Sequence, residues 1–224
     1  MGDFACRRRS GEIGAQVAKD RFGLAPVDRH RIGAQSAGDH SELAIIFILL
    51  AAGRGTRFGG DKLSRDLRGK PLWNWAALAA EKASFSQCYL VCRPDSSLCP
   101  RAGWEAVINH HADEGMGSSI AAGVAAAAPK CERLVIALAD MPLVEPGHLR
   151  DLARLRGTVF TRYDDGAEGP PAAFPKKAFA ALQTLTGERG ARHLNLSETA
   201  TLVPANGHML ADVDTPAALD ALSR

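Results

Sequence analysis

A continuous apolar segment, residues 44–50, leads directly into a glycine-rich loop at residues 53–60. Uninterrupted runs of isoleucine and leucine are typical of strands that are buried on both faces of a parallel sheet. A second apolar segment, residues 133–139, runs straight into Asp140. The two segments therefore predict central strands of an α/β protein, each followed by a chemically distinctive turn.

Shorter segments alternate between the periods of strands and helices. Further strands are expected at residues 87–92, 104–109, 158–163, 171–174 and 199–204. Helices are expected from Pro71 onward, at residues 117–128, 146–155, 176–183 and 188–196, and after Thr215-Pro216. This alternation predicts a mostly parallel sheet, whose ligands would bind at the carboxyl ends of the strands.

Composition narrows the class of protein further. The chain has 224 residues, of which 46% are hydrophobic, enough for one sizeable core, and this excludes a disordered chain or a coiled coil. Its 27 basic and 25 acidic residues give a formal net charge of +2, which is no electrostatic signature of nucleic-acid binding. The longest apolar stretch has about half the length of a membrane span. We expect a cytoplasmic protein with small-molecule partners, and with neither nucleic acid nor membrane among them.

The N-terminal segment and the cysteines carry little functional signal. Residues 1–43 combine scattered charges and glycines without a structural period, which predicts a disordered extension before a domain at residues 44–224. The five cysteines include no Cys-x-x-Cys pair, and we interpret them as reduced thiols without a metal or redox role.

The glycine-rich loop has the chemistry of a phosphate site. Glycines let the backbone approach a phosphate closely, and Arg57 and Lys62 would supply the positive charge that a triphosphate needs. Two common phosphate loops are excluded. Phe58 stands where a dinucleotide-binding loop needs its third glycine, and Asp61 separates Gly60 from the lysine that a P-loop needs directly after glycine.

Two acidic segments complete the candidate site. Asp140 follows the second apolar strand, and Asp212 and Asp214 precede the last expected helix. Taken alone, an aspartate at the end of a strand is more often a turn former or a helix cap, and a turn with a helix cap explains the second segment equally well. Together with the glycine-rich loop, Asp140 and Asp214 can be interpreted as an oxygen-donor clamp for Mg²⁺ that bridges nucleotide phosphates.

These motifs, in this order, resemble one family. Leu-Ala-Ala-Gly-x-Gly-x-Arg-x-Gly-Gly-x-Lys at residues 50–62 is similar to the signature loop of the MobA-like nucleotidyltransferases. Within that group, residues 114–120, 138–142 and 187–192 resemble motifs of the molybdenum cofactor cytidylyltransferases, and residues 212–216 match the closing Asp-x-Asp-Thr-Pro. The resemblance implies a three-layer, Rossmann-like α/β nucleotidyltransferase fold with a mostly parallel central sheet.

The resemblance also implies roles for individual residues. Base and ribose would lie against Leu50, Ala51, Ala52 and Gly53, and the triphosphate against Gly55, Arg57 and Lys62. Asn109, Gly117 and Ser118 would line the nucleotide pocket, and Asp140 and Asp214 would bind Mg²⁺. The expected catalytic residues are Lys62, Arg57 and Asp140.

Two features bear on the choice of substrates. The Ala51-Ala52 pair resembles the cytidylyl enzymes, whereas the guanylyl relatives usually carry Ala-Gly-Gly in this loop. On the acceptor side, Gly-Pro-Pro-Ala at residues 169–172 departs from the family's usual Gly-[His/Asn]-Pro-Val.

The implied reaction is the Mg²⁺-dependent transfer of CMP from CTP to molybdopterin, with release of pyrophosphate and formation of molybdopterin cytosine dinucleotide. The terminal phosphate of molybdopterin is already anionic, so it can attack without a general base. The alternatives are guanylyl transfer to the same cofactor, nucleotidyl transfer to another phosphorylated small molecule, or a non-catalytic cofactor-binding maturation factor. A recipient molybdoenzyme or its maturation factor would be the protein partner. The presence of Lys62, Asp140 and Asp214 favours an enzyme, since a carrier needs no metal clamp.

Overall fold

The structure is a computed structural model that describes residues 44–224, so the extension expected at residues 1–43 lies outside the described residues. The strands of the main sheet are β1 (Ile45–Leu50), β4 (Gln87–Cys92), β5 (Trp104–Ile108), β6 (Arg133–Leu138), β7 (Thr158–Arg162), β8 (Glu168–Pro175) and β9 (Thr199–Leu202). The helices are α1 (Leu72–Ala83), α2 (Met116–Ala127), α3 (Pro146–Arg154), α4 (Phe179–Gln183) and α5 (Pro216–Ser223). No helix within residues 44–224 is both long enough and apolar enough to cross a membrane.

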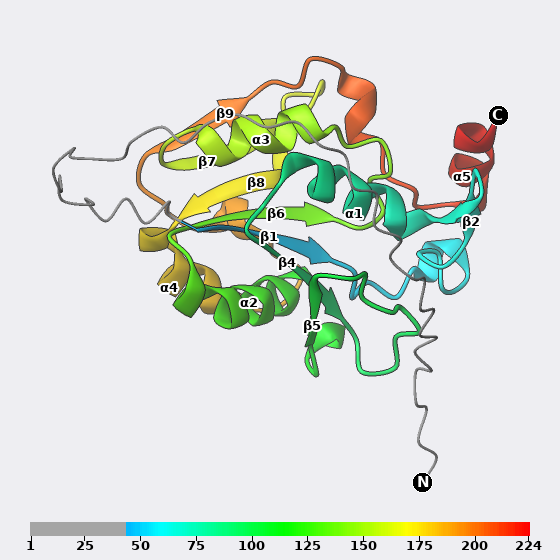
Figure 1. Cartoon of the computed structure of the whole chain (residues 1–224), viewed down its shortest axis with the longest axis horizontal. Helices are drawn as coiled ribbons and strands as arrows, with labels where there is room; N and C mark the ends of the chain where they lie inside the picture. The colour runs from blue at the N-terminus through cyan, green and yellow to red at the C-terminus, as the bar shows by residue number, and fades with distance from the viewer. Residues whose placement is uncertain (1–43) are drawn as a thin grey trace, which may run out of the picture. The chain divides into compact units, whose positions relative to one another are not determined.

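The central sheet has seven strands in the order β5-β4-β1-β6-β8-β7-β9 (Figure 1). β1 pairs in parallel with β4 and β6, β4 with β5, and β7 with β9. Only β8 runs against its neighbours, pairing antiparallel with β6 and β7. The mostly parallel sheet predicted from the sequence is thus confirmed.

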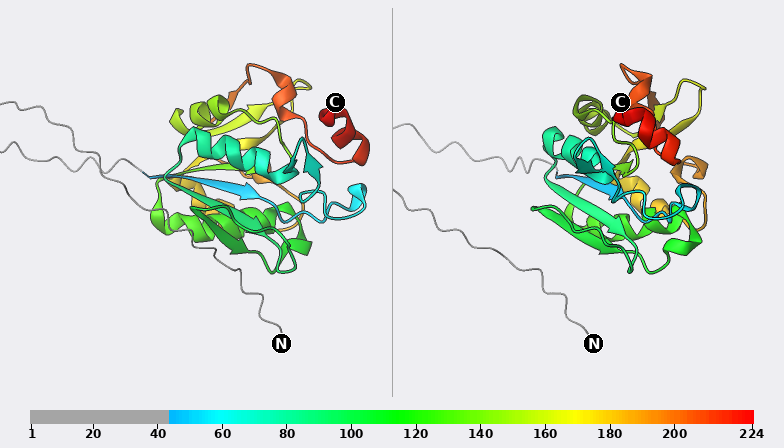
Figure 2. Two further views of the ribbon diagram at one scale, coloured as in Figure 1. Left: turned by 45° about the vertical axis from the view of Figure 1, so that its right-hand side comes forward. Right: turned by 90° about the vertical axis from the view of Figure 1, so that its right-hand side faces the viewer.

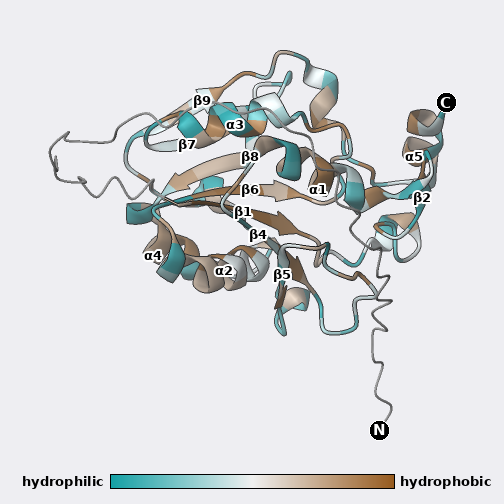
Figure 3. Ribbon diagram, in the orientation of Figure 1, coloured by the Kyte–Doolittle hydropathy of each residue, from teal (hydrophilic) through white to brown (hydrophobic). Residues whose placement is uncertain are grey.

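The side chains of the central strands alternate between two apolar layers. In β1, Phe47 and Leu49 join the cluster on one face, whereas Ile46 and Ile48 join the cluster on the other. Helices α1 and α3 cover the first face, and α2 and α4 cover the second, as Figures 1 and 2 show. Because both faces are covered, the central strands are hydrophobic along most of their length (Figure 3). The three-layer α/β arrangement follows from this double burial.

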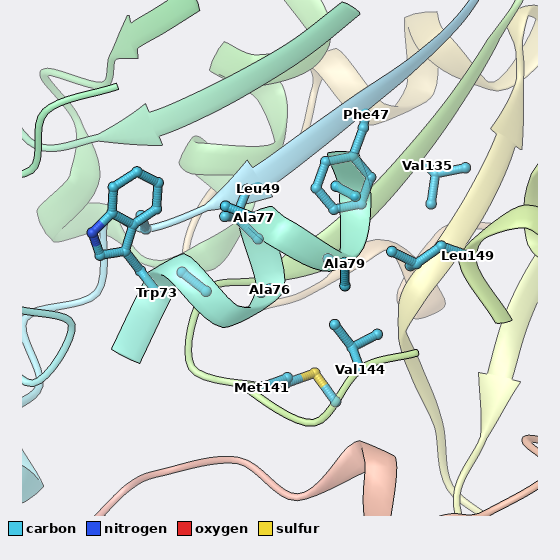
Figure 4. Packing of buried hydrophobic residues seen from close by; sticks show 14 of the residues in the cluster. Phe47, Leu49, Trp73, Ala76, Ala77, Ala79, Val135, Met141, Val144 and Leu149 are labelled. Atoms are coloured by element: carbon cyan, nitrogen blue, oxygen red, sulfur yellow. The ribbon is translucent and has the colours of Figure 1, made fainter. Parts of the chain in front are cut away.

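The face under α1 is closely packed. Ala76 and Ala77 on α1 are fully buried, and they lie in the same cluster as Phe47 and Leu49 of β1 (Figure 4). On the opposite face, a Cβ added to Gly123 of α2 would lie 2.8 Å from a methyl carbon of Ile48. Small residues therefore bring both helices close to the sheet, which fixes the positions of the loops at its carboxyl edge.

Two segments differ from the sequence prediction. Residues 188–196 were expected to form a helix, but only the 3₁₀ turn Ala191–His193 forms there. Gly187 has a positive φ of 66°, and its carbonyl accepts a hydrogen bond from the N–H of Gly117, so this segment docks as a loop on the start of α2. A small two-stranded sheet, β2 (Asp66–Leu67) with β3 (Lys70–Pro71), also forms without having been predicted.

A buried histidine makes the stability of this fold dependent on pH. His148 Nε2 lies 2.7 Å from Thr161 Oγ1, which in turn donates to the carbonyl oxygen of Pro171 at 2.5 Å. Burial lowers the pKa of His148 below its usual value of 6.5. Just below pH 6.5, His148 therefore binds a proton in the unfolded chain but stays neutral in the folded chain. The free energy of unfolding is then expected to decrease as pH falls below about 6.5.

Chemical denaturation at about pH 7.5 and about pH 5.5 measures this decrease. His148→Gln keeps a hydrogen-bond donor but does not titrate, so it should lose less stability between the two pH values than the wild type. His208→Gln, at an exposed position, should behave like the wild type. An unchanged pH dependence in His148→Gln would contradict the prediction.

Candidate active site

The glycine-rich loop and Asp140 meet at one edge of the sheet. Leu50, the last residue of β1, is paired with Leu138, the last residue of β6. Because the two strands are parallel neighbours, the segments that follow them lie at the same carboxyl edge. This pairing brings together two motifs that are about ninety residues apart in the sequence.

Backbone geometry in the loop requires glycine at position 55. Gly55 has a φ of 61°, and a Cβ placed there would lie 2.5 Å from the carbonyl oxygen of Gly60. The carbonyl of Gly55 accepts hydrogen bonds from the N–H groups of Phe58, Gly59 and Gly60 at 2.9 to 3.3 Å. The N–H groups of residues 53–55 donate to no described residue, so they are available to an anionic ligand.

Lys62 connects the loop to both predicted metal ligands. Its Nζ donates to Asp140 Oδ2 at 2.7 Å and to Asp214 Oδ1 at 2.9 Å. The lysine side chain is only 9% exposed, whereas the two carboxylates are 20% and 39% exposed. The lysine is thus the least exposed of the three side chains.

The segment that carries Asp214 is attached to the segment that carries Asp140. The N–H of Val213 donates to the carbonyl oxygen of Asp140 at 3.0 Å. Arg57 Nη1, from the glycine-rich loop, donates to the second carboxylate oxygen of Asp214 at 2.9 Å. The four charged residues among the five expected to bind metal and triphosphate therefore form one connected cluster.

The cluster shifts the proton affinities of its members. Burial alone would lower the pKa of Lys62, but attraction to Asp140 and hydrogen bonds to both carboxylates outweigh burial and raise it. The hydrogen bond from Lys62, assisted by Arg57, lowers the pKa of Asp214 despite partial burial. Lys62 is thus charged and Asp214 ionised near neutral pH.

One oxygen in the cluster fits a divalent cation. Asp140 Oδ1 is buried and has no hydrogen-bond partner among the described residues. An unpartnered buried carboxylate oxygen is costly unless a ligand completes it. Residues 44–224 contain no group of three His, Cys, Asp or Glu side chains that could enclose a metal ion. A pair of carboxylates, completed by water and phosphate oxygens, is the donor set that Mg²⁺ prefers.

Two cavities open at this edge of the sheet. One, of about 420 Å³, is lined by the loop residues Leu50, Ala52, Gly53, Arg54 and Thr56, by the segment before and at the start of α2, by Ser119 and by Asp140. The other, of about 410 Å³, lies between α2, β7, β8 and residues 188–193. Leu50, Met116 and Glu188 line both cavities, so the two cavities adjoin.

The remaining predicted residues lie around the first cavity. Ala51 faces the core, and its N–H donates to the carbonyl oxygen of Val91. Asn109 is 2% exposed, and its amide nitrogen donates to Ser118 Oγ at 2.9 Å and to Ser119 Oγ at 3.0 Å. Gly117 contacts the backbone of Thr186 so closely that a Cβ would lie 2.7 Å from its carbonyl oxygen. These residues support the cavity wall, and only Ser119 among the buried polar groups there lines the cavity itself.

Sequence reasoning missed several residues of the site. Arg54 and Asp113 line the first cavity and form an ion pair across 59 positions of sequence. Phe160, Tyr163 and His193 line the second cavity. Arg54 could have been noticed in the sequence as a basic residue inside the glycine-rich loop. The other positions belong to no local motif, so the sequence offers no signal for them.

The clash at Gly55 leads to a prediction about ligand binding. Gly55→Ala is expected to weaken nucleotide binding at least tenfold, because a side chain at this φ is strained and its Cβ would collide with the Gly60 carbonyl. Gly59→Ala is the matched control, since Gly59 also has a positive φ, of 86°, but a Cβ there meets nothing within 4 Å. Calorimetric titration of each variant with nucleotide measures the difference. Equal losses in both variants would show that the collision is unimportant.

Two sequence comparisons place most of this chain among known proteins. The sequence profile described as the MobA-like NTP transferase domain matches residues 47–201. The purine catabolism protein PucB of Bacillus subtilis is 28% identical over 197 residues, which are 80% of this chain and 96% of PucB.

Solved structures share the fold. Rv0371c from Mycobacterium tuberculosis H37Rv superposes with a TM-score of 0.69 at 25% identity, over 80% of this chain and 98% of Rv0371c. A structure of Rv0371c in complex with manganese gives a TM-score of 0.64 at 26% identity, over 80% of this chain and 97% of that chain. The molybdopterin-guanine dinucleotide biosynthesis protein A of Archaeoglobus fulgidus, at 19% identity and a TM-score of 0.57, covers 80% of this chain and 96% of its own, and it supports the fold alone.

The matched profile covers more than half of the chain and includes most of the loop-and-carboxylate cluster. The sheet order, the loop after β1 and the acidic turn after β6 are therefore parts of one inherited scaffold. The chain belongs to the family of MobA-like NTP transferases, which are nucleotidyltransferases.

Proposed function

We propose that this protein transfers CMP from CTP to molybdopterin in a divalent-metal-dependent reaction that releases pyrophosphate. The observation that carries the proposal is the position of Asp140, which Lys62 links to Asp214, in the wall of the first of two adjoining cavities. A transfer between two substrates needs a donor and an acceptor held next to each other and close to a source of positive charge.

The first cavity is the proposed nucleotide site. It is lined by the Leu50, Ala52 and Gly53 portion of the loop, and the free N–H groups of residues 53–55 are near it. The Ala51-Ala52 pair of the loop, of which Ala52 lines the cavity, supports CTP over GTP, because guanylyl enzymes of the resembled family usually carry Ala-Gly-Gly at this point. Asp140 lines the same cavity, which would place the triphosphate next to the carboxylate pair.

The second cavity is the proposed acceptor site. Its lining includes the apolar side chains of Ile120, Ile136, Phe160 and Phe174, together with Arg192, His193 and three acidic residues, Asp165, Glu168 and Glu188. The apolar side chains suit the face of a ring system with polar edges, and the Arg192 guanidinium suits an anionic phosphate. A pterin that carries a terminal phosphate combines both properties.

The proposed chemistry is positioning with charge stabilisation. Asp140 and Asp214 would hold Mg²⁺, which, when bound, neutralises charge on the triphosphate. Lys62 and Arg57 would stabilise the charge that develops on the phosphate oxygens and on the leaving pyrophosphate. The acceptor phosphate is already ionised, so no residue of the site has to remove a proton from it.

A second acceptor is favoured by one observation. Pro170 lines the acceptor cavity at the position where relatives usually carry histidine or asparagine, so this chain lacks that polar side chain. Nucleotidyl transfer to a different phosphorylated small molecule is therefore the second candidate function.

Pyrophosphate release tests both candidates. Purified protein would be incubated with Mg²⁺, molybdopterin and either CTP or GTP. Release that needs both CTP and molybdopterin is the expected result. Release with GTP alone would overturn the assignment of the base. Nucleotide binding without release would overturn molybdopterin as the acceptor and leave the second candidate.

A further inference from the structure

Arg54 and Asp113 form a two-point ion pair at the proposed nucleotide site. Arg54 Nε donates to Asp113 Oδ1 at 2.6 Å, and Arg54 Nη2 donates to Asp113 Oδ2 at 2.5 Å. Both residues line the 420 Å³ cavity, Arg54 from the glycine-rich loop and Asp113 from the 3₁₀ turn Ala112–Glu114. Their side chains are 55% and 66% exposed, so an entering ligand can reach them.

The ion pair with Asp113 leaves one edge of the Arg54 guanidinium free. A guanidinium has five N–H donors arranged in a planar fork. Asp113 takes one from Nε and one from Nη2, and the remaining three donate to no residue in the described part of the chain. The free Nη1 edge can therefore make a second two-point contact with an anion while Asp113 remains bound.

Arg54 differs from the other two basic residues at residues 53–62, because it makes no ion pair with Asp140 or Asp214. Lys62 and Arg57 are both paired with the proposed metal ligands. Arg54 lies between Gly53 and Gly55, at the point where three successive N–H groups have no described partner. A free guanidinium edge next to free backbone donors has the chemistry of a phosphate contact.

We propose that Arg54 binds the phosphate chain of the nucleotide through its Nη1 edge, and that Asp113 is a positioning residue that orients this edge. The inference rests on the proposed function, since it takes the first cavity as the nucleotide site. Asp113 restricts a flexible side chain before the ligand arrives, which lowers the ordering cost of binding. The same contact lowers the pKa of Asp113, so the pair persists at neutral pH.

A double-mutant cycle on nucleotide affinity tests the proposal. The Kd for CTP and for CMP would be measured by titration calorimetry with Mg²⁺ for the wild type, Arg54→Ala, Asp113→Asn and the double variant. We expect Arg54→Ala to raise the Kd of CTP about tenfold and that of CMP less than threefold, because CMP lacks the outer phosphates. Asp113→Asn should raise the Kd of CTP about threefold alone and leave it unchanged when Arg54 is already absent.

Two further variants separate positioning from stability. The charge-swapped Arg54→Asp/Asp113→Arg protein can restore the ion pair, so it should remain folded. Its cation would lie on the 3₁₀ turn Ala112–Glu114 and not on the glycine-rich loop, so it should still bind CTP weakly. Arg65→Ala removes an exposed arginine whose side chain makes no hydrogen bond or ion pair with a described residue, and it should bind CTP like the wild type.

Several results would overturn the proposal. Tighter CTP binding by Asp113→Asn would make Asp113 a competitor of the phosphates, and an equal loss from Asp113→Asn in both backgrounds would separate it from Arg54. Unchanged binding by Arg54→Ala, in a protein that binds CTP, would refute the role of Arg54 and leave the proposed function intact. A wild type that binds neither CTP nor GTP would overturn both. If only GTP binds, the same cycle is measured with GTP and GMP, and the same differences between variants support or refute the role of Arg54.

Discussion

Asp140→Asn is expected to reduce nucleotidyl transfer about a thousandfold, which corresponds to about 4 kcal/mol of transition-state stabilisation. The substitution keeps the size of the side chain but removes the negative charge from the group that carries the unpartnered buried oxygen. It also replaces one of the two carboxylates that contact Lys62 by an amide. The proposed metal site would then have a single anionic ligand in Asp214, and a divalent cation would be held more weakly and less well oriented.

The measurement is pyrophosphate release at saturating CTP and molybdopterin, combined with Mn²⁺ binding followed by electron paramagnetic resonance. Asp212→Asn is the matched control, because Asp212 lies in the same acidic segment, is exposed and makes no hydrogen bond or ion pair with a described residue. We expect that control to keep most of its activity. Loss of activity in Asp140→Asn with unchanged Mn²⁺ affinity would contradict a metal-binding role for this carboxylate.

The parts of the fold that could be predicted from sequence are those with strong local patterns. β1 and β6 are runs of apolar residues, and the structure places them within one residue of the expected bounds. Once these strands are parallel neighbours, the loop after β1 and Asp140 after β6 must meet at one edge, so the centre of the site follows from topology. Their position in the fold could be predicted because the glycine-rich loop and Asp140 come directly after strands that are easily recognised in the sequence.

The parts that could not be predicted depend on contacts between distant segments. Asn109 and Ser118 look like ligand-binding residues in sequence, yet they hydrogen-bond to each other inside the cavity wall. The helix expected at residues 188–196 is replaced by a loop because Gly187 meets the start of α2. The partner of Arg54 could not be identified either, since Asp113 is exposed, belongs to no motif and lies 59 positions away in the sequence.

The contacts of Lys62 give the second large effect. Its ammonium lies between Asp140 and Asp214, 2.7 and 2.9 Å from their oxygens, where a shared cation would otherwise be expected. Asp140 keeps its Oδ1 free, but both oxygens of Asp214 are held, one by this ammonium and one by Arg57. A divalent cation that binds both carboxylates therefore has to displace one of these two contacts and lies close to the Lys62 ammonium. Lysine and metal ion then compete for the same pair of carboxylates, and the outcome depends on which cation gains more from the low exposure of the site.

Lys62→Met removes the competing charge and keeps an apolar stem of similar length. We expect it to raise the affinity for Mn²⁺ without nucleotide about tenfold, and to lower turnover about a thousandfold because the triphosphate loses its buried cation. Without metal, Asp140 would lose its ion-pair partner while Asp214 would keep only the exposed Arg57, so the free energy of unfolding at neutral pH should decrease by about 2 kcal/mol. Saturating Mn²⁺ should restore this loss, which would give the variant a larger rise in Tm on metal addition than the wild type.

Lys82→Met provides the control for charge removal. Lys82 lies on α1, is exposed, and its ammonium makes no ion pair with a described residue. Its substitution should change neither Mn²⁺ affinity nor turnover. If Lys62→Met instead weakened Mn²⁺ binding, the lysine would be a support of the metal site, and the competition inferred from its position between the carboxylates would be wrong. If Mn²⁺ bound more tightly but turnover were unchanged, Lys62 would compete with the metal and have no part in stabilising the triphosphate.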